Sequence, residues 1–113
     1  METLEERIER IEFYQSLLIK LLDDKLAPFY KMMMEAKLSK KEIQDLLQLC
    51  EELSNEYKKQ KAEGFVVFTP LLTQFVGMLD PKLEPSKTIE VLATHGNYTP
   101  LMQEFKSMIA NIQ

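Results

Sequence analysis

The chain has 113 residues, of which 45% are hydrophobic and 28% are charged, and its net charge is −4. This length predicts one domain over residues 1–113, with an N-terminal part at 3–63 and a C-terminal part at 65–112. An acidic chain with no basic segment is poorly suited to bind the phosphates of nucleic acids or anionic lipids. One cysteine and no long apolar run indicate a cytoplasmic protein that does not enter a membrane.

The first predicted helix begins at the capping box Thr3-Leu4-Glu5-Glu6 and ends near Lys25, because Pro28 disfavours helix at the residue before it. Its apolar side chains cover an unusually wide surface. One face carries Leu4, Ile8, Ile11, Tyr14, Leu18, Leu21 and Leu22, and Phe13, Leu17 and Ile19 lie outside that face. We expect contact on two sides, either with the chain's own core and a neighbouring subunit or with two internal helices.

A short helix is expected from about Pro28 to Lys37. It contains Phe29, Tyr30 and three consecutive methionines at 32–34. Three consecutive residues cannot share one helical face, so at least one methionine should be exposed or lie in an interface. Phe29, Tyr30 and Met33 are therefore candidates for a docking surface, since methionine suits adaptable binding. The alternative is that they fill an irregular core.

The long helix predicted at about 40–63 begins with a second capping box, formed by Ser39 and Glu42, and ends at Gly64. Its apolar positions follow the heptad spacing Ile43, Leu46, Cys50, Leu53, Tyr57. Beyond residue 54 the helix is largely polar. We expect the first half to be buried and the second half to project and meet a partner along a strip that includes Tyr57, Gln60 and Lys61.

Three shorter helices are predicted after Gly64. Residues 65–68 are interpreted as an extended, buried connection, and Thr69-Pro70 then caps and begins a helix. Residues 98–109 resemble 68–79 in sequence, which predicts two helices with the same buried face. Between them a helix starts at Pro85 or Ser86, runs through Thr94 and is closed by Gly96. The predicted fold is all-α, an irregular multihelical domain of about six helices with one long central helix, assembled as an oligomer.

The sequence gives no constellation of catalytic or metal-ligating residues. Cys50 at a core heptad position fits a small buried hydrophobe, and His95 lacks nearby ligands that would complete a metal site. The adjacent acids Asp23-Asp24 and Glu51-Glu52 point in different directions around a helix. We therefore predict no enzyme activity, no metal and no cofactor.

Several short segments spread over nearly the full length of the chain are similar to those of a known protein family. They are Arg7-Ile8-Glu9-Arg10, Pro28-Phe29-Tyr30, Leu38-Ser39-Lys40, Cys50 with Glu52-Leu53-Ser54, Gln60-Lys61-Ala62 with Gly64-Phe65-Val66, and Thr88-Ile89. Through them the chain resembles the YhaI-like family of small uncharacterised proteins from Bacillus and its relatives. The resemblance implies a multihelical fold and a bacterial cytosolic setting. It carries over no activity, ligand or catalytic residue.

The leading functional hypothesis is a non-enzymatic helical module that associates with itself as a dimer or trimer and acts in interaction or regulation, with another protein as a further partner. Arg7, Arg10 and Tyr14 are candidate contacts, the arginines pairing with glutamates of a neighbour. On this hypothesis Tyr57→Asp disrupts assembly and leaves most helix content in place.

Two alternatives belong to other classes. A DNA-associated regulator would use helices in 86–112, although the segment 98–109 has no arginine, so nucleic acid is an unfavoured partner. A titration with duplex DNA at low salt tests it. A small-molecule-binding protein would gain thermal stability from some member of a metabolite and metal panel.

Overall fold

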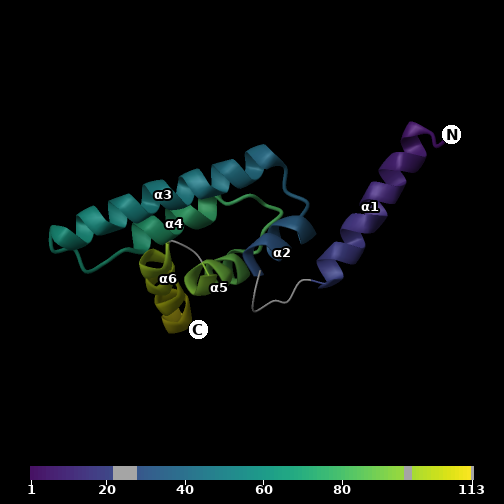
Figure 1. Cartoon of the computed structure of the whole chain (residues 1–113). Helices are drawn as coiled ribbons and strands as arrows, with labels where there is room; N and C mark the ends of the chain where they lie inside the picture. Colours follow the sequence, from purple (N-terminus) through teal and green to yellow (C-terminus); the bar gives the residue numbers. More distant parts are fainter. Residues whose placement is uncertain (22–27, 96–97, 113) are drawn as a thin grey trace.

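A computed structural model describes residues 1–21, 28–95 and 98–112 of the chain. In these residues it contains six α-helices and no strand, so the all-α prediction is confirmed (Figure 1). The helices are α1 (Leu4–Leu21), α2 (Pro28–Glu35), α3 (Lys40–Ala62), α4 (Thr69–Met78), α5 (Pro85–His95) and α6 (Thr99–Ile112). The predicted end of the first helix near Lys25, and Gly96, lie outside the described residues.

Both predicted capping boxes are present. At α3, Glu42 N–H donates to Ser39 Oγ over 3.1 Å and Ser39 N–H donates to a Glu42 carboxylate oxygen over 2.8 Å. At α1, Glu6 N–H donates to Thr3 Oγ1 over 3.1 Å, and Thr3 N–H donates to Glu6 Oε1 over 3.4 Å. These bonds satisfy amides that have no partner within the helix, which fixes both helix starts.

The long helix α3 ends as predicted at Gly64, which has a φ of 93°. The Phe65 amide donates to the Gln60 carbonyl over 2.9 Å, and the Gly64 amide to the Lys61 carbonyl over 3.1 Å. These two bonds form a Schellman motif. The chain therefore turns back sharply after α3, and this reversal decides where the next segment packs.

The end of α2 has the same pair of bonds without a glycine. Lys37 has a φ of 57°, the Leu38 amide donates to the Met33 carbonyl and the Lys37 amide to the Met34 carbonyl. A left-handed conformation is unfavourable for a residue with a Cβ atom. We expect Lys37→Gly to raise the free energy of unfolding by about 0.5–1 kcal/mol in a urea titration. Lys58→Gly, inside α3, is the control and should lower it by about 1 kcal/mol; a lower stability for Lys37→Gly would contradict the expectation.

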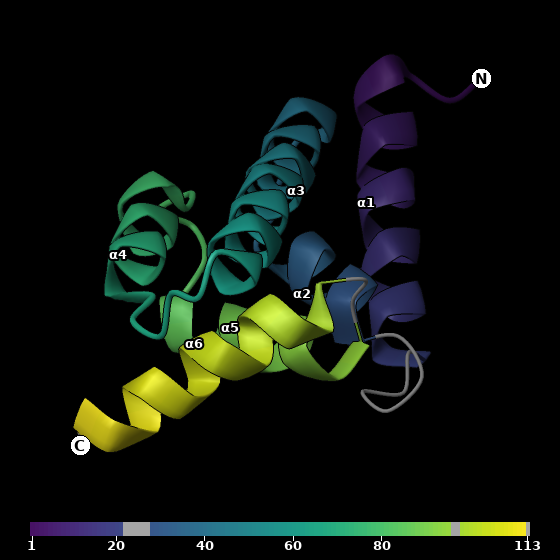
Figure 2. The same cartoon turned by 90° about the vertical axis from the view of Figure 1, so that its left-hand side faces the viewer.

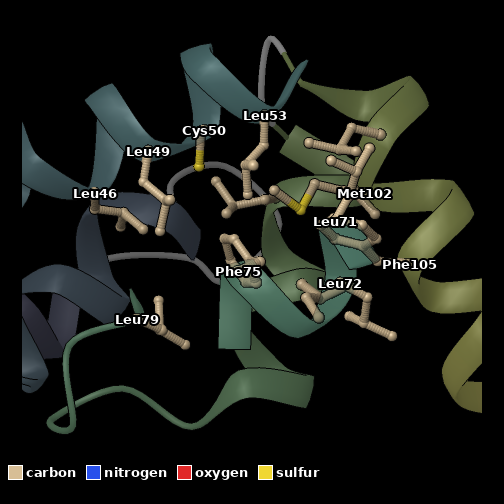
Figure 3. Close-up of a cluster of buried hydrophobic side chains, with 14 of the residues drawn as sticks. Leu46, Leu49, Cys50, Leu53, Leu71, Leu72, Phe75, Leu79, Met102 and Phe105 are labelled. Atoms are coloured by element: carbon tan, nitrogen blue, oxygen red, sulfur yellow. The ribbon is translucent and has the colours of Figure 1, made fainter. Parts of the chain in front are cut away.

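The core lies between α2, α3, α4, α5 and α6, and part of it is drawn in Figure 3. The segments 68–79 and 98–109 bury corresponding side chains, as predicted, and their fully buried phenylalanines, Phe75 and Phe105, meet with ring centroids 5.6 Å apart. The predicted cap at Thr69 is wrong in detail. Phe68 occupies the N-cap position of α4 without a side-chain hydrogen bond, and Thr69 is already helical.

The molecule is elongated, with extents of 65 × 25 × 23 Å and a radius of gyration of 17.2 Å. A compact domain of this length would have a radius of about 13 Å. The reason is α1, which projects away from the other helices and lies nearest to α2 (Figures 1 and 2). The C-terminal end of α3 projects beyond α4, as predicted, and its side chains after Tyr57 are exposed apart from half-buried Gln60 (Figure 1).

The connection at 65–68 also differs from its prediction. Phe65, Val66 and Val67 are exposed, Val66 at 85%, and only Phe68 is buried. After the turn at Gly64 the chain runs along the outside of the molecule before Phe68 inserts. The segment predicted to be buried is therefore exposed and apolar, and only its last residue is buried.

Candidate interaction surface

Helix α1 exposes its large apolar side chains, apart from Ile19, which is half-buried. Eight large apolar side chains on it are between 41% and 80% exposed, and the helix has no buried residue. They are Leu4, Ile8, Ile11, Phe13, Tyr14, Leu17, Leu18 and Leu21. We call this set the α1 surface. Leu22, which was assigned to the same face, lies outside the described residues.

An exposed helix of this length has little to stabilise it. The capping box, the acids Glu5 and Glu6 in the first turn and Lys20 in the last turn favour helix formation locally. Isolated helices of about 15 residues are nevertheless marginal in water, and most helical stability in proteins comes from packing an apolar face. The α1 surface therefore has the composition of a packed helix face without a covering element among the described residues.

The two arginines nominated from the sequence both lie on α1 and differ in their contacts. Arg10 Nη2 is 3.0 Å from Glu2 Oε1 of the same chain, so this guanidinium is already paired. Arg7 is exposed and makes no ion pair with another described residue. Tyr14 belongs to the α1 surface, with its ring centroid 6.3 Å from that of Phe13. Of the two arginines, only Arg7 keeps its charge available for a neighbour.

The candidates on α2 divide between the core and the surface. Tyr30 is exposed, Phe29 is half-buried, and their rings meet edge to face at 5.4 Å. Met33 is 2% exposed, so its nomination as surface was wrong: it faces the core together with Met32. Met34 points outward, which confirms that the three methionines cannot share one face.

Tyr57 was also wrongly assigned to an exposed strip. It is 6% exposed and packs edge to face on Phe68, with ring centroids 4.8 Å apart. The Schellman turn at Gly64 brings Phe68 back onto α3, so the chain itself covers the position expected to meet a partner. Tyr57→Asp would place a carboxylate in the core, and it is therefore unsuitable as a test of assembly.

Gln60 and Lys61 make their contacts within α3. The Gln60 amide donates to Glu56 Oε1 over 3.0 Å, and Lys61 Nζ lies 5.6 Å from the centroid of the Tyr57 ring. Gln60 is half-buried and Lys61 is exposed. Both side chains thus have partners on their own helix, so this end of α3 offers a weaker case for a docking surface than α1 does.

A groove lies between the first half of α3 and the loop after α4, and it is lined mainly by acidic and apolar side chains. At its edge Lys82 Nζ is 2.9 Å from Glu42 Oε1. The Ser39 amide and the Lys82 ammonium lower the pKa of Glu42 from 4.5 to about 2. The Glu42 carboxylate is thus held by the capping box and by Lys82 in the loop after α4.

This lowered pKa has a consequence for stability. The contribution of the ionised Glu42 carboxylate is fully present above pH 4.5 and is lost as the pH falls toward 2. The urea midpoint should therefore fall over this window, and Glu42→Gln should reduce the fall. Glu63→Gln, at the far end of α3, should leave the fall unchanged. Identical pH profiles for the wild type and Glu42→Gln would contradict the assignment.

Cys50 is fully buried in the core, as the heptad position predicted, and burial raises the pKa of its thiol to about 12. We expect the native protein to react very slowly with a thiol reagent at pH 8 and the unfolded protein to react at once. Gln44→Cys, at an exposed position of α3, is the control and should react rapidly in the native state. Rapid native labelling of the wild type would contradict this burial.

The other candidate sites have little geometry to support them. Among the described residues, no three histidine, cysteine or acidic side chains lie close enough to hold a metal ion. The His95 side chain and the pair Asp23-Asp24 lie outside the described residues. On α6 the exposed face offers Gln103 and a single base, Lys106, beside half-buried Glu104. A helix with this charge is poorly suited to contact DNA phosphates.

The exposed apolar residues at 65–67 were missed by the sequence reasoning, because a buried strand-like connection and an exposed one have the same composition.

No helix in the described ranges combines the length and the apolar character needed to span a membrane. The model of one protein family, described as Protein of unknown function (DUF1878), matches residues 1–110. The match includes α1 and nearly all of α6.

Proposed function

We propose that this chain, which belongs to the DUF1878 family of proteins of unknown function, is a non-enzymatic helical module that assembles with further copies of itself through α1. The observation that carries the proposal is the α1 surface, eight large apolar side chains on one uncovered helix. Soluble monomers rarely expose contiguous apolar patches of more than a few hundred Å². A second copy supplies a covering face of the same kind.

The size of the surface fits an interface between subunits. Phe13 and Leu17 lie on the other side of the helix. At roughly 100 Å² of exposed area each, the remaining six side chains of the α1 surface offer on the order of 600 Å² per chain, the lower end of what one partner contributes to a standard stable interface. Burying it stabilises both the assembly and α1 itself, because a marginal helix is ordered by packing. Dimer and trimer both satisfy this argument.

Assembly through α1 would hold several copies of the α2–α6 unit together. Repeated presentation of one surface raises the effective concentration for any partner that contacts two copies, which favours a role in interaction or regulation. The exposed residues at 65–67 would be one such repeated surface. The bacterial cytoplasmic setting implied by the resemblance to the YhaI-like proteins is part of this proposal.

Hydrogen exchange of the α1 amides tests the proposal. A covered helix should be protected well above the rate of an unstructured peptide, and its protection should fall on dilution as the assembly dissociates. The amides of α3 serve as the internal control, because their protection comes from the chain's own core. Exchange of α1 at the free-peptide rate at every concentration would contradict the proposal.

A further inference from the structure

We propose that the α1 helices of the assembly lie parallel and in register, with Arg7 of each chain against Glu12 of the next. The proposal rests on the self-association proposed above and specifies its geometry. Its basis is the order of polar residues along α1, all of them exposed in the structure, together with the end of α1 at which the other helices are attached.

A narrow seam runs the length of α1. Leu4, Ile8, Ile11, Gln15 and Leu18 follow the alternating spacing of four and three residues that keeps one stripe facing a partner helix. In heptad notation, Ile8 and Gln15 are at position a, and Leu4, Ile11 and Leu18 are at position d. The seam is therefore of the coiled-coil type, with one polar side chain in it.

The charges beside the seam differ between its two flanks. One flank carries Glu5 and Glu12 at e positions, and the other carries Arg7 at a g position, followed by Tyr14 and Leu21. In a parallel pair a g residue faces the e residue five positions further along the partner, which places Arg7 against Glu12 and Tyr14 against Ile19. In an antiparallel pair each flank meets its own kind, so glutamate would face glutamate.

The contacts within one chain agree with this assignment. Arg10 lies away from the seam and is paired with Glu2 of its own chain. Arg7 and Glu12 lie beside the seam and make no ion pair with another described residue, so both charges are available across an interface. Opposite charges at these positions give orientation and register their specificity.

Gln15 gives a second, independent reason for the register. It is the polar member of the seam, and in a parallel, in-register assembly it lies beside the Gln15 side chains of the other copies. The amides can then donate to one another. Any shifted or antiparallel arrangement places Gln15 against leucine or isoleucine, which leaves a desolvated amide without a partner. A single polar seam residue of this kind specifies register.

The position of the other helices supports the same orientation. The α2–α6 unit is attached at the C-terminal end of α1, and the N-terminus is at the far end (Figure 1). The apolar side chains outside the seam, Phe13 and Leu17, are in the half of α1 nearer this unit. A parallel assembly gathers all the α2–α6 units around the half of α1 that carries these side chains. An antiparallel one places them beside the acidic first turns of the partner.

Cross-linking through a new cysteine tests the orientation. In a parallel assembly the Leu4 positions of neighbouring chains are opposite each other, within disulfide reach, whereas in an antiparallel pair they are about 25 Å apart. We expect Leu4→Cys to form an inter-chain disulfide under mild oxidation. Ser16→Cys, on the opposite side of α1, should not. The native Cys50 does not interfere, because it is fully buried.

Exchange of charges provides a second measurement. Arg7→Glu and Glu12→Arg should each weaken the association by about tenfold, and the double variant, which exchanges the two charges of every pair, should restore it. In an antiparallel pair Glu12→Arg would instead strengthen the association. An assembled protein without the Leu4→Cys cross-link overturns the parallel orientation alone. A protein that is monomeric in light scattering overturns the proposed function as well.

Discussion

Ile11→Asp is expected to convert the assembly to a 13.2 kDa monomer while the helices α2–α6 stay folded. Ile11 lies in the middle of the α1 seam, is 50% exposed and is absent from the core cluster. In the assembly each copy would bury an unpaired carboxylate, which costs several kcal/mol, so the dissociation constant should rise at least 100-fold. Light scattering measures the mass, and circular dichroism measures the retained helix.

The matched control for this variant is Ser16→Asp. It adds the same side chain to the same helix, on the side away from the seam, where the Ser16 hydroxyl donates to the Phe13 carbonyl over 2.6 Å. The mass of this variant should stay that of the wild type. Equal masses for Ile11→Asp and wild-type protein would mean that α1 does not form the interface.

Phe75→Ala should have the largest effect on folding stability. Its side chain is fully buried and contacts Phe105 across the interface between α4 and α6 (Figure 3). Replacing it loses the transfer free energy of the ring and leaves a cavity, so the free energy of unfolding should fall by about 3–5 kcal/mol. The urea midpoint measures the change. The measurement belongs in the Ile11→Asp background, because the stability of an oligomer depends on protein concentration.

Val76→Ala is the control for the core prediction. Val76 follows Phe75 on the same helix, is 43% exposed and does not belong to the core cluster. Its truncation should lower the free energy of unfolding by less than about 1 kcal/mol. If both variants lose the same stability, the core does not lie between α4 and α6 as described.

The sequence predicted well the features that depend on residues close to one another in the chain. The capping boxes at Thr3 and Ser39 and the glycine turn at Gly64 are formed by groups within six residues, so the pattern contains both partners. The left-handed Lys37 was not predicted, because no glycine marks it. The burial of Cys50 followed from its heptad position, because the apolar face of the first half of α3 packs on the core.

Prediction failed where the answer depends on how distant segments meet. Tyr57 has the spacing of an interface residue, and only the return of Phe68 after the turn shows that the chain covers it. The α1 surface presents the converse problem. An apolar stripe is the same whether its own core or another chain covers it, so the sequence left both alternatives open. The structure, in which the other helices leave α1 exposed, favours the second.

The most direct test of assembly through α1 is the solution mass of the wild-type chain, measured by light scattering over a range of concentrations. We expect a mass of at least twice 13.2 kDa that persists on dilution to the micromolar range. A mass of 13.2 kDa at every concentration would contradict assembly through α1, since its eight apolar side chains would then face solvent in the native protein.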